Sequence, residues 1–114
     1  MTPEPTADAA TTAGAYLTLA EYRDRMAERG DTTVVYFFHA PWCPDCKATE
    51  ESLAADGVPD GLTVVKVDYD SETELRRQYG ITQQHTFVQV DPEGAELAVW
   101  TGSRSGAEIA AETR

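Results

Sequence analysis

The chain has 114 residues, of which 41% are hydrophobic, enough for one buried core but not for two. Its formal net charge of −11 argues against binding to nucleic acid or to anionic membrane surfaces, because both need clustered Lys and Arg. No stretch approaches the roughly 20 apolar residues of a membrane span. We therefore expect a single domain with neither a nucleic-acid nor a membrane partner.

Residues 1–14 are acidic and rich in Pro, Thr and Ala, with few side chains that a core could bury. This composition predicts a disordered tail and leaves residues 15–114 as the folded domain. The start of the chain lacks both the basic residues and the apolar stretch of a signal peptide, so we expect a cytoplasmic protein. In that compartment two lone cysteines are more often redox-active or metal-binding than structural.

The folded part begins with a short predicted edge strand at residues 15–17. Thr18 and Glu21 then form a capping box, in which each side chain bonds the other residue's backbone N–H. The pattern predicts that a helix follows this box and ends at Gly30. The apolar face of this helix is formed at three- and four-residue spacings by Leu19, Tyr22 and Met26.

The β-branched and aromatic run at residues 33–38 predicts a buried central strand, and good helix formers after it predict a helix from Cys43 to about Ala55. A second capping box, formed by Ser71 and Glu74, predicts the start of a short helix that ends at Gly80. The other predicted elements are a strand at 62–68, a β-hairpin of strands 86–90 and 97–101, and a last helix at 105–112.

This order of elements predicts an α/β fold. Strands separated by helices favour parallel pairing, whereas the final hairpin must be antiparallel. We therefore expect a mixed central sheet of four to five strands with helices on both faces.

Both cysteines lie where the central strand gives way to a helix, in Cys-x-x-Cys spacing. The first N–H groups of a helix have no internal partner and carry the positive end of its dipole, so they stabilise an anion. A thiolate at Cys43 would be such an anion, and the thiolate is the reactive form of cysteine. Cys46, one turn further in, is expected to be more buried and to attack a mixed disulfide formed by Cys43.

The cysteines belong to the motif Trp42-Cys43-Pro44-Asp45-Cys46-Lys47. This motif resembles the Trp-Cys-x-x-Cys-Lys active site of the thioredoxin family, and its Pro-Asp centre is similar to that of small thioredoxin-related proteins. The order of elements over residues 15–114 is also similar to the thioredoxin fold.

The resemblance implies a thiol–disulfide oxidoreductase that acts on disulfides of proteins or small molecules. Its redox group would be the Cys43–Cys46 disulfide, with no metal or other cofactor. An external reductase or thiol would restore the dithiol, since the sequence has no Gly-rich dinucleotide motif. We expect the protein to act as a monomer.

Several positions depart from the family pattern. Aligning Thr86 with the family's second active-site loop puts His85 where the family has a cis-proline facing the cysteines, so both residues are expected beside the site. Phe37 replaces a buried aspartate that assists proton transfer at the second cysteine in the family. His39 replaces a tryptophan. Lys66 resembles a strand lysine near the family's active site, but the aspartate it would pair with is absent.

The residues inside the motif have simple local roles. Trp42 is expected to be a partly exposed aromatic that flanks the site, and Pro44 suits the first helical turn, where no N–H is needed. The negative charge of Asp45 interacts favourably with the positive end of the helix dipole. The same charge would disfavour a thiolate at Cys43 and make the pair a better reductant.

Three interpretations stay open for the two histidines. His39 and His85 replace family residues without catalytic duty, or His85 acts as a general acid and base at the thiol pair. In the third interpretation both histidines join Cys43 and Cys46 in a metal site. The alternative function is then a metal-binding or redox-sensing adaptor on the same fold.

Overall fold

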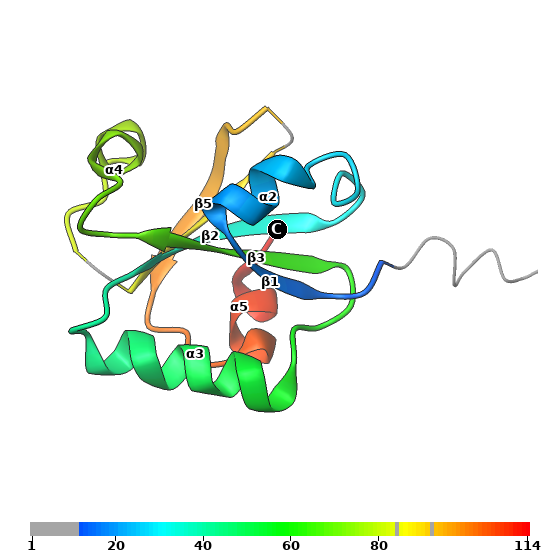
Figure 1. Ribbon diagram of the computed structural model, residues 1–114, viewed down its shortest axis with the longest axis horizontal. Helices are drawn as coiled ribbons and strands as arrows, with labels where there is room; N and C mark the ends of the chain where they lie inside the picture. Colours follow the sequence, from blue (N-terminus) through cyan, green and yellow to red (C-terminus); the bar gives the residue numbers. More distant parts are fainter. Residues whose placement is uncertain (1–11, 84, 92) are drawn as a thin grey trace, which may run out of the picture.

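A five-stranded mixed sheet forms the centre of the molecule, with the strand order β1-β3-β2-β4-β5 (Figure 1). The computed structural model describes residues 12–83, 85–91 and 93–114. Strands β1 and β2 both pair in parallel with β3, whereas β4 is antiparallel to β2 and β5. The strands are β1 (Ala15–Thr18), β2 (Thr33–His39), β3 (Leu62–Asp68), β4 (Thr86–Val90) and β5 (Glu96–Thr101). The predicted mixed sheet is therefore confirmed.

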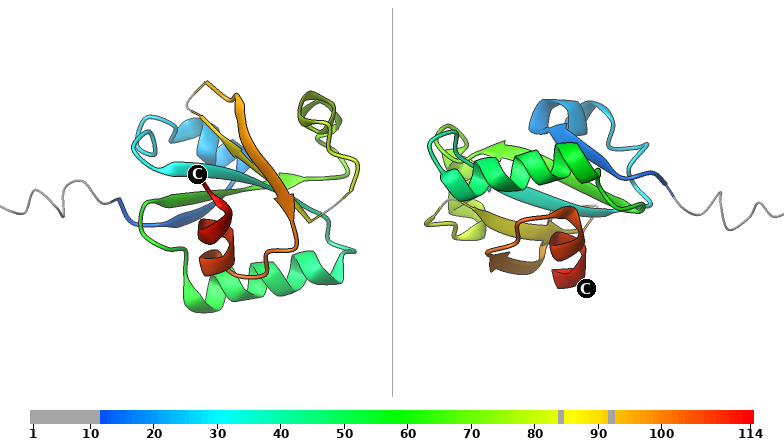
Figure 2. Two further views of the ribbon diagram at one scale, coloured as in Figure 1. Left: turned by 180° about the vertical axis from the view of Figure 1, so that it is seen from behind. Right: turned by 90° about the horizontal axis from the view of Figure 1, so that it is seen from below.

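Helices cover both faces of this sheet, as predicted (Figure 2). The helices are α2 (Leu19–Asp24), α3 (Pro44–Asp56), α4 (Thr73–Tyr79) and α5 (Gly106–Glu112). Helices α2 and α4 contribute Tyr22 and Tyr79 to one buried cluster, and α3 and α5 contribute Leu53 and Ile109 to a second cluster on the opposite face.

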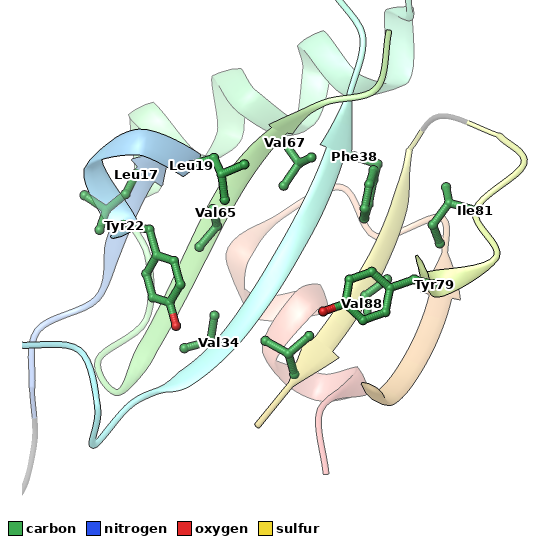
Figure 3. Close-up of a cluster of buried hydrophobic side chains, with 11 residues drawn as sticks. Leu17, Leu19, Tyr22, Val34, Phe38, Val65, Val67, Tyr79, Ile81 and Val88 are labelled. Atoms are coloured by element: carbon green, nitrogen blue, oxygen red, sulfur yellow. The ribbon is translucent and has the colours of Figure 1, made fainter. Parts of the chain in front are cut away.

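The central strand β2 supplies side chains to both clusters because its residues alternate between the two faces. Val34 and Phe38 belong to the cluster under α2 and α4, which Figure 3 shows. Val35 and Phe37 belong to the cluster under α3, which also contains Cys46. This near-continuous burial explains why the sequence reads as an apolar run rather than a half-polar strand.

Helix α2 is shorter than the sequence predicts. The Thr18 capping box forms, but the helix ends at Asp24 instead of Gly30. Beyond Asp24 the chain continues in turns, in which the Arg29 N–H donates to Arg25 O (3.2 Å) and Met26 O (3.1 Å). The Arg29 side chain makes tertiary bonds, because its Nε donates to Thr63 Oγ1 (2.8 Å) and its Nη2 donates to Ala13 O (2.6 Å). Met26 consequently lies beyond the helix, and 43% of it is exposed.

The predicted capping box at the start of α4 is wrong. Glu72 is the N-cap and makes no side-chain cap bond. Ser71 Oγ instead donates to Asp68 Oδ2 (2.9 Å), so its hydroxyl closes the turn after β3. The helix ends at Gly80, which has a left-handed backbone (φ +68°), as expected for a terminating glycine.

Of the predicted tail at residues 1–14, residues 1–11 lie outside the described residues. The last residues before β1 contact the body of the domain, since Thr12 O accepts a bond from Gly61 N (2.6 Å) and Ala13 O accepts one from Arg29. Within the part of the chain that the structure describes, no helix is both long enough and apolar enough to cross a bilayer.

Candidate active site

The two cysteines form the N-terminal turn of α3. Cys43 is the N-cap, and its Sγ accepts a bond from the backbone N–H of Cys46 at 3.2 Å. Pro44 occupies the first helical position, where its missing N–H costs no bond. Both side chains are free thiols and both are buried, Cys43 with 3% and Cys46 with 0% of the residue exposed. The sulfur of Cys43 thus sits where a helix favours an anion.

Cys46 is held as a thiol. Burial and, secondarily, the hydrogen bond with Cys43 raise the pKa of the Cys46 thiol to about 12, although the backbone N–H groups of Ala40 and His85 act in the opposite direction. At neutral pH Cys46 must therefore give up its proton before it can act as a nucleophile.

A pocket of about 270 Å³ opens over the nucleophile end of this pair. It gives access to Cys43 despite the small exposed fraction of that residue. The pocket is lined by Cys43, Asp45, Gln83, His85, Thr101 and Gly102. Three segments distant in sequence therefore meet here: the start of α3, the loop before β4 and the end of β5.

Asp45 is paired with a residue that sequence reasoning missed. Arg104 Nη2 donates to Asp45 Oδ1 at 2.9 Å, across 59 residues of sequence. Both side chains are more than half exposed. The guanidinium offsets much of the carboxylate charge, so Asp45 opposes a thiolate at Cys43 less than the motif alone suggests.

Trp42 lies at the rim of the site with 56% of the residue exposed. Its indole is held in one orientation, because Nε1 donates to Asp70 Oδ2 at 2.9 Å and the ring meets the Tyr69 ring edge-on. The structure therefore places a fixed, exposed aromatic surface next to Cys43, and Asp70 is a partner that the sequence did not indicate.

His85 lies beside the cysteines. Its backbone N–H donates to Phe38 O (2.8 Å) and also faces the Cys46 sulfur. Its φ of +62° is in the left-handed region, unusual for a residue with a side chain. The ring Nε2 lies 2.7 Å from Ser103 O and 3.1 Å from Thr49 Oγ1. The next residue, Thr86, is buried, and its hydroxyl donates to Gln83 O (2.8 Å).

The His39 ring, like the His85 ring, contacts the Phe37 ring edge-on. The centroid of the Phe37 ring is 5.5 Å from that of His39 and 6.0 Å from that of His85, and the ring itself stacks on Phe87. Burial is the main cause that lowers the pKa of His39 below its usual value, and it outweighs the opposing charge of Glu50. The two histidines thus belong to different surroundings.

Glu50 organises the surroundings of His39. Its Oε2 accepts bonds from Tyr16 Oη (2.7 Å) and Lys66 Nζ (2.9 Å), and its Oε1 lies 3.4 Å from His39 Nε2. Burial acts to raise the pKa of Glu50, but the bonds from Lys66 and Tyr16 outweigh it and the pKa is lowered. Burial and Glu50 raise the pKa of Tyr16.

Lys66 therefore does have a carboxylate partner, supplied by α3 instead of by β2. Sequence reasoning missed Glu50. Its position could have been predicted from the helical pattern. Glu50 follows Cys46 by four residues on a predicted helix, which places the two side chains on the same side of the helix, one turn apart.

The proposed metal ligands do not converge. Among residues 12–83, 85–91 and 93–114, no three His, Cys, Asp or Glu side chains are grouped so that they could hold a metal ion. The nitrogen Nε2 of His85 bonds Ser103 O, and Nε2 of His39 lies beside the Glu50 carboxylate. The geometry therefore gives no support to a site built from Cys43, Cys46, His39 and His85.

The thioredoxin family model matches residues 14–114 of the chain. The chain belongs to the thioredoxin family. A thioredoxin-like protein from Fusarium culmorum is 42% identical over 72 residues, which cover 60% of this chain and 59% of that protein. Thioredoxin-1 from Drosophila melanogaster is 32% identical over 73 residues, which cover 62% of this chain and 68% of the fly protein.

A longer relative also matches over part of its length. Protein disulfide-isomerase A3 from Gallus gallus is 32% identical over 88 residues, which cover 75% of this chain but only 17% of the chicken protein. Among solved structures, Trxlp from Edwardsiella tarda superposes with a TM-score of 0.63 at 24% identity, covering 87% of this chain and 99% of that one. That likeness supports the thioredoxin fold.

Proposed function

We propose that this member of the thioredoxin family is a thiol–disulfide oxidoreductase that reduces disulfides with the Cys43–Cys46 dithiol. The observation that carries the proposal is the asymmetry of the pair. The Cys43 sulfur accepts a backbone N–H at the start of α3 and borders the pocket, whereas Cys46 is fully buried and held as a thiol. One sulfur is thus arranged to attack a substrate and the other to act afterwards.

The reaction takes place in two exchanges. The Cys43 thiolate attacks one sulfur of the substrate disulfide, and the other sulfur leaves and takes up a proton, which yields the first thiol and a mixed disulfide at Cys43. Cys46 then loses its proton and attacks the Cys43 sulfur, which releases the second substrate thiol. The substrate gains two electrons and two protons, and the pair becomes the Cys43–Cys46 disulfide.

Two features of the rim support a disulfide carried on a peptide or small molecule as the substrate. The pocket of about 270 Å³ admits a disulfide and its adjacent atoms, and the exposed Trp42 face offers an apolar surface beside it. A dithiol protein or a low-molecular-weight thiol then returns two electrons to the oxidised pair. Both partners are part of the proposal.

Trapping tests the order of attack. Cys46→Ser, incubated with insulin, is expected to accumulate a covalent adduct that a reductant releases, because the resolving sulfur is missing. Cys43→Ser is the matched control and is expected to form no adduct, and the parent is expected to reduce insulin. Equal adducts from both variants, or no insulin reduction by the parent, would refute the assigned function.

A further inference from the structure

The second exchange needs a proton acceptor next to Cys46. The thiol is fully buried, and the Phe37 ring on the adjoining strand cannot accept a proton. Helix geometry places Thr49 and Glu50 on either side of Cys46, three and four residues further along α3. Thr49 borders the His85 ring and Glu50 borders Lys66, so there is one titratable side chain on each side that could serve as the acceptor.

Glu50 is poorly suited to the task. Its carboxylate already accepts bonds from Tyr16 and Lys66, and these bonds outweigh burial and lower its pKa. A carboxylate stabilised in this way holds a proton weakly. Glu50 and Lys66 therefore form a fixed ion pair on this side of Cys46, and neither is suited to act as the base.

The hydrogen bonds of His85 fix the position of its ring proton. A carbonyl oxygen only accepts, so the 2.7 Å contact with Ser103 O requires a hydrogen on Nε2. The Thr49 hydroxyl has two carbonyl acceptors, Asp45 O (2.9 Å) and Ser103 O (3.1 Å), and when it donates to either of them it turns a lone pair towards the same Nε2. With the hydrogen on Nε2, the neutral imidazole keeps its free lone pair on Nδ1.

Cys46 and His85 meet at one backbone oxygen. The Cys46 sulfur lies 4.0 Å from Phe38 O, the same oxygen to which the His85 N–H donates (2.8 Å), and Nδ1 is the ring nitrogen nearer to the His85 backbone. The left-handed φ of +62° is a strained conformation for histidine, maintained here by the bonds at both ends of the residue. Strain of this kind is concentrated at functional sites.

We propose that His85 Nδ1 accepts the Cys46 proton as Cys46 attacks the mixed disulfide. The proposal rests on the thiol–disulfide function above. The S–S bond between Cys43 and the substrate breaks, the Cys43–Cys46 bond forms, and the departing substrate sulfur takes the proton back from the imidazolium. Ser103 O and the Thr49 hydroxyl are positioning groups, since they orient the ring through Nε2 and stabilise its charged form.

The charged and titratable groups around His85 come from two segments. The start of α3 contributes Cys43, Cys46 and Asp45, and the loop after β5 contributes Arg104, which is paired with Asp45. The Asp45–Arg104 pair has no net charge, so it adds little to the electric field at the imidazole.

The two exchanges can be timed separately with an aromatic disulfide whose thiol is coloured on release. The first release reports attack by Cys43, and the second reports resolution by Cys46. His85→Asn is the informative variant, because asparagine tolerates positive φ and retains an amide donor for Ser103 O but is not a base. Glu50→Gln is the matched control on the other side of Cys46.

We expect His85→Asn to slow the second release about a hundredfold near neutral pH, the lower end of the range for general-base catalysis, and to leave the first within about threefold. Added imidazole is expected to restore part of the rate of the variant, since it supplies the missing base. Glu50→Gln is expected to keep the second release within about twofold of the parent, since its carboxylate is not the base.

A second release in His85→Asn within about twofold of the parent overturns the role of His85, with the thiol–disulfide function intact. A slow second release in Glu50→Gln with a normal one in His85→Asn also overturns it and assigns the base to Glu50. If the parent shows no first release, the thiol–disulfide function itself is wrong, which distinguishes the two failures.

Discussion

Arg104 Nη2 lies 2.9 Å from Asp45 Oδ1, so the carboxylate two residues after the nucleophile is balanced by a cation from the loop after β5. The pair is exposed and contributes little to folding stability. Its position at the edge of the pocket that contains Cys43 gives it an electrostatic effect on the thiol chemistry instead.

This pairing predicts how the reduction potential responds to charge. Arg104→Met leaves the Asp45 charge unbalanced, which disfavours the thiolate and should make the pair more reducing by about 5–20 mV, where ~30 mV corresponds to ~1.4 kcal/mol. Asp45→Asn alone should shift the potential in the opposite direction by less. Equilibration with glutathione measures both.

The double variant Arg104→Met/Asp45→Asn is the control for this prediction. With both charges removed, its potential should return to near that of the parent. A double variant as reducing as Arg104→Met alone would show that the arginine acts on the dithiol independently of Asp45.

The raised pKa of Cys46 predicts a loss of stability at alkaline pH. The unfolded chain loses this proton near pH 9.0, whereas the folded chain retains it until about pH 12. The contribution is therefore fully present below pH 9.0 and decreases as pH rises towards 12, by about 1.4 kcal/mol per pH unit. Urea unfolding at pH 8 and pH 10 should show a smaller decrease for Cys46→Ala than for the parent. Equal decreases would contradict the assignment.

The local part of the site could be predicted from the sequence. Cys43, Pro44 and Cys46 are positioned by a strand end and a helix start, which short-range patterns reveal. The order of the strands along the chain was also accessible, because β-branched runs mark the buried strands of the sheet. The early end of α2 was not, since the turns after Asp24 pack through side-chain bonds from Arg29 to Thr63 and Ala13, which lie far away in sequence.

The partners of the site residues could not be predicted in the same way. Arg104 reaches Asp45 across 59 residues of sequence, and Ser103 O reaches His85 from a loop whose path depends on the β4–β5 hairpin. Glu50 replaces the missing strand carboxylate from a different element. Such contacts depend on packing between elements, which residue spacing does not reveal.

The bond between Trp42 and Asp70 predicts a difference between large and small substrates. Asp70→Leu removes the acceptor of the indole N–H, so Trp42 loses its fixed orientation at the rim. Ordering the indole again on binding costs free energy, so reduction of insulin should slow about twofold to fivefold. A small aromatic disulfide that reaches Cys43 through the pocket should react at the parent rate. Equal slowing of both substrates would indicate damage to the thiol pair itself.

The Lys66–Glu50 pair predicts a contribution to the free energy of unfolding that depends on pH. Lys66→Met leaves the half-buried Glu50 carboxylate with its Tyr16 bond but without its cation, and should destabilise the fold by about 1 kcal/mol, a value reduced for partial exposure. The pKa of Glu50 is lowered in the folded state, so the contribution of its ionised form is present above the unfolded value of 4.5 and is lost as pH falls below it. The destabilisation by Lys66→Met should therefore be full at pH 7 and shrink in strong acid.

Lys47→Met, at an exposed lysine of α3, is the control and should change the free energy of unfolding little at either pH. A loss that is the same at pH 7 and pH 3 would mean that Lys66 stabilises the fold through its alkyl chain and not through its charge.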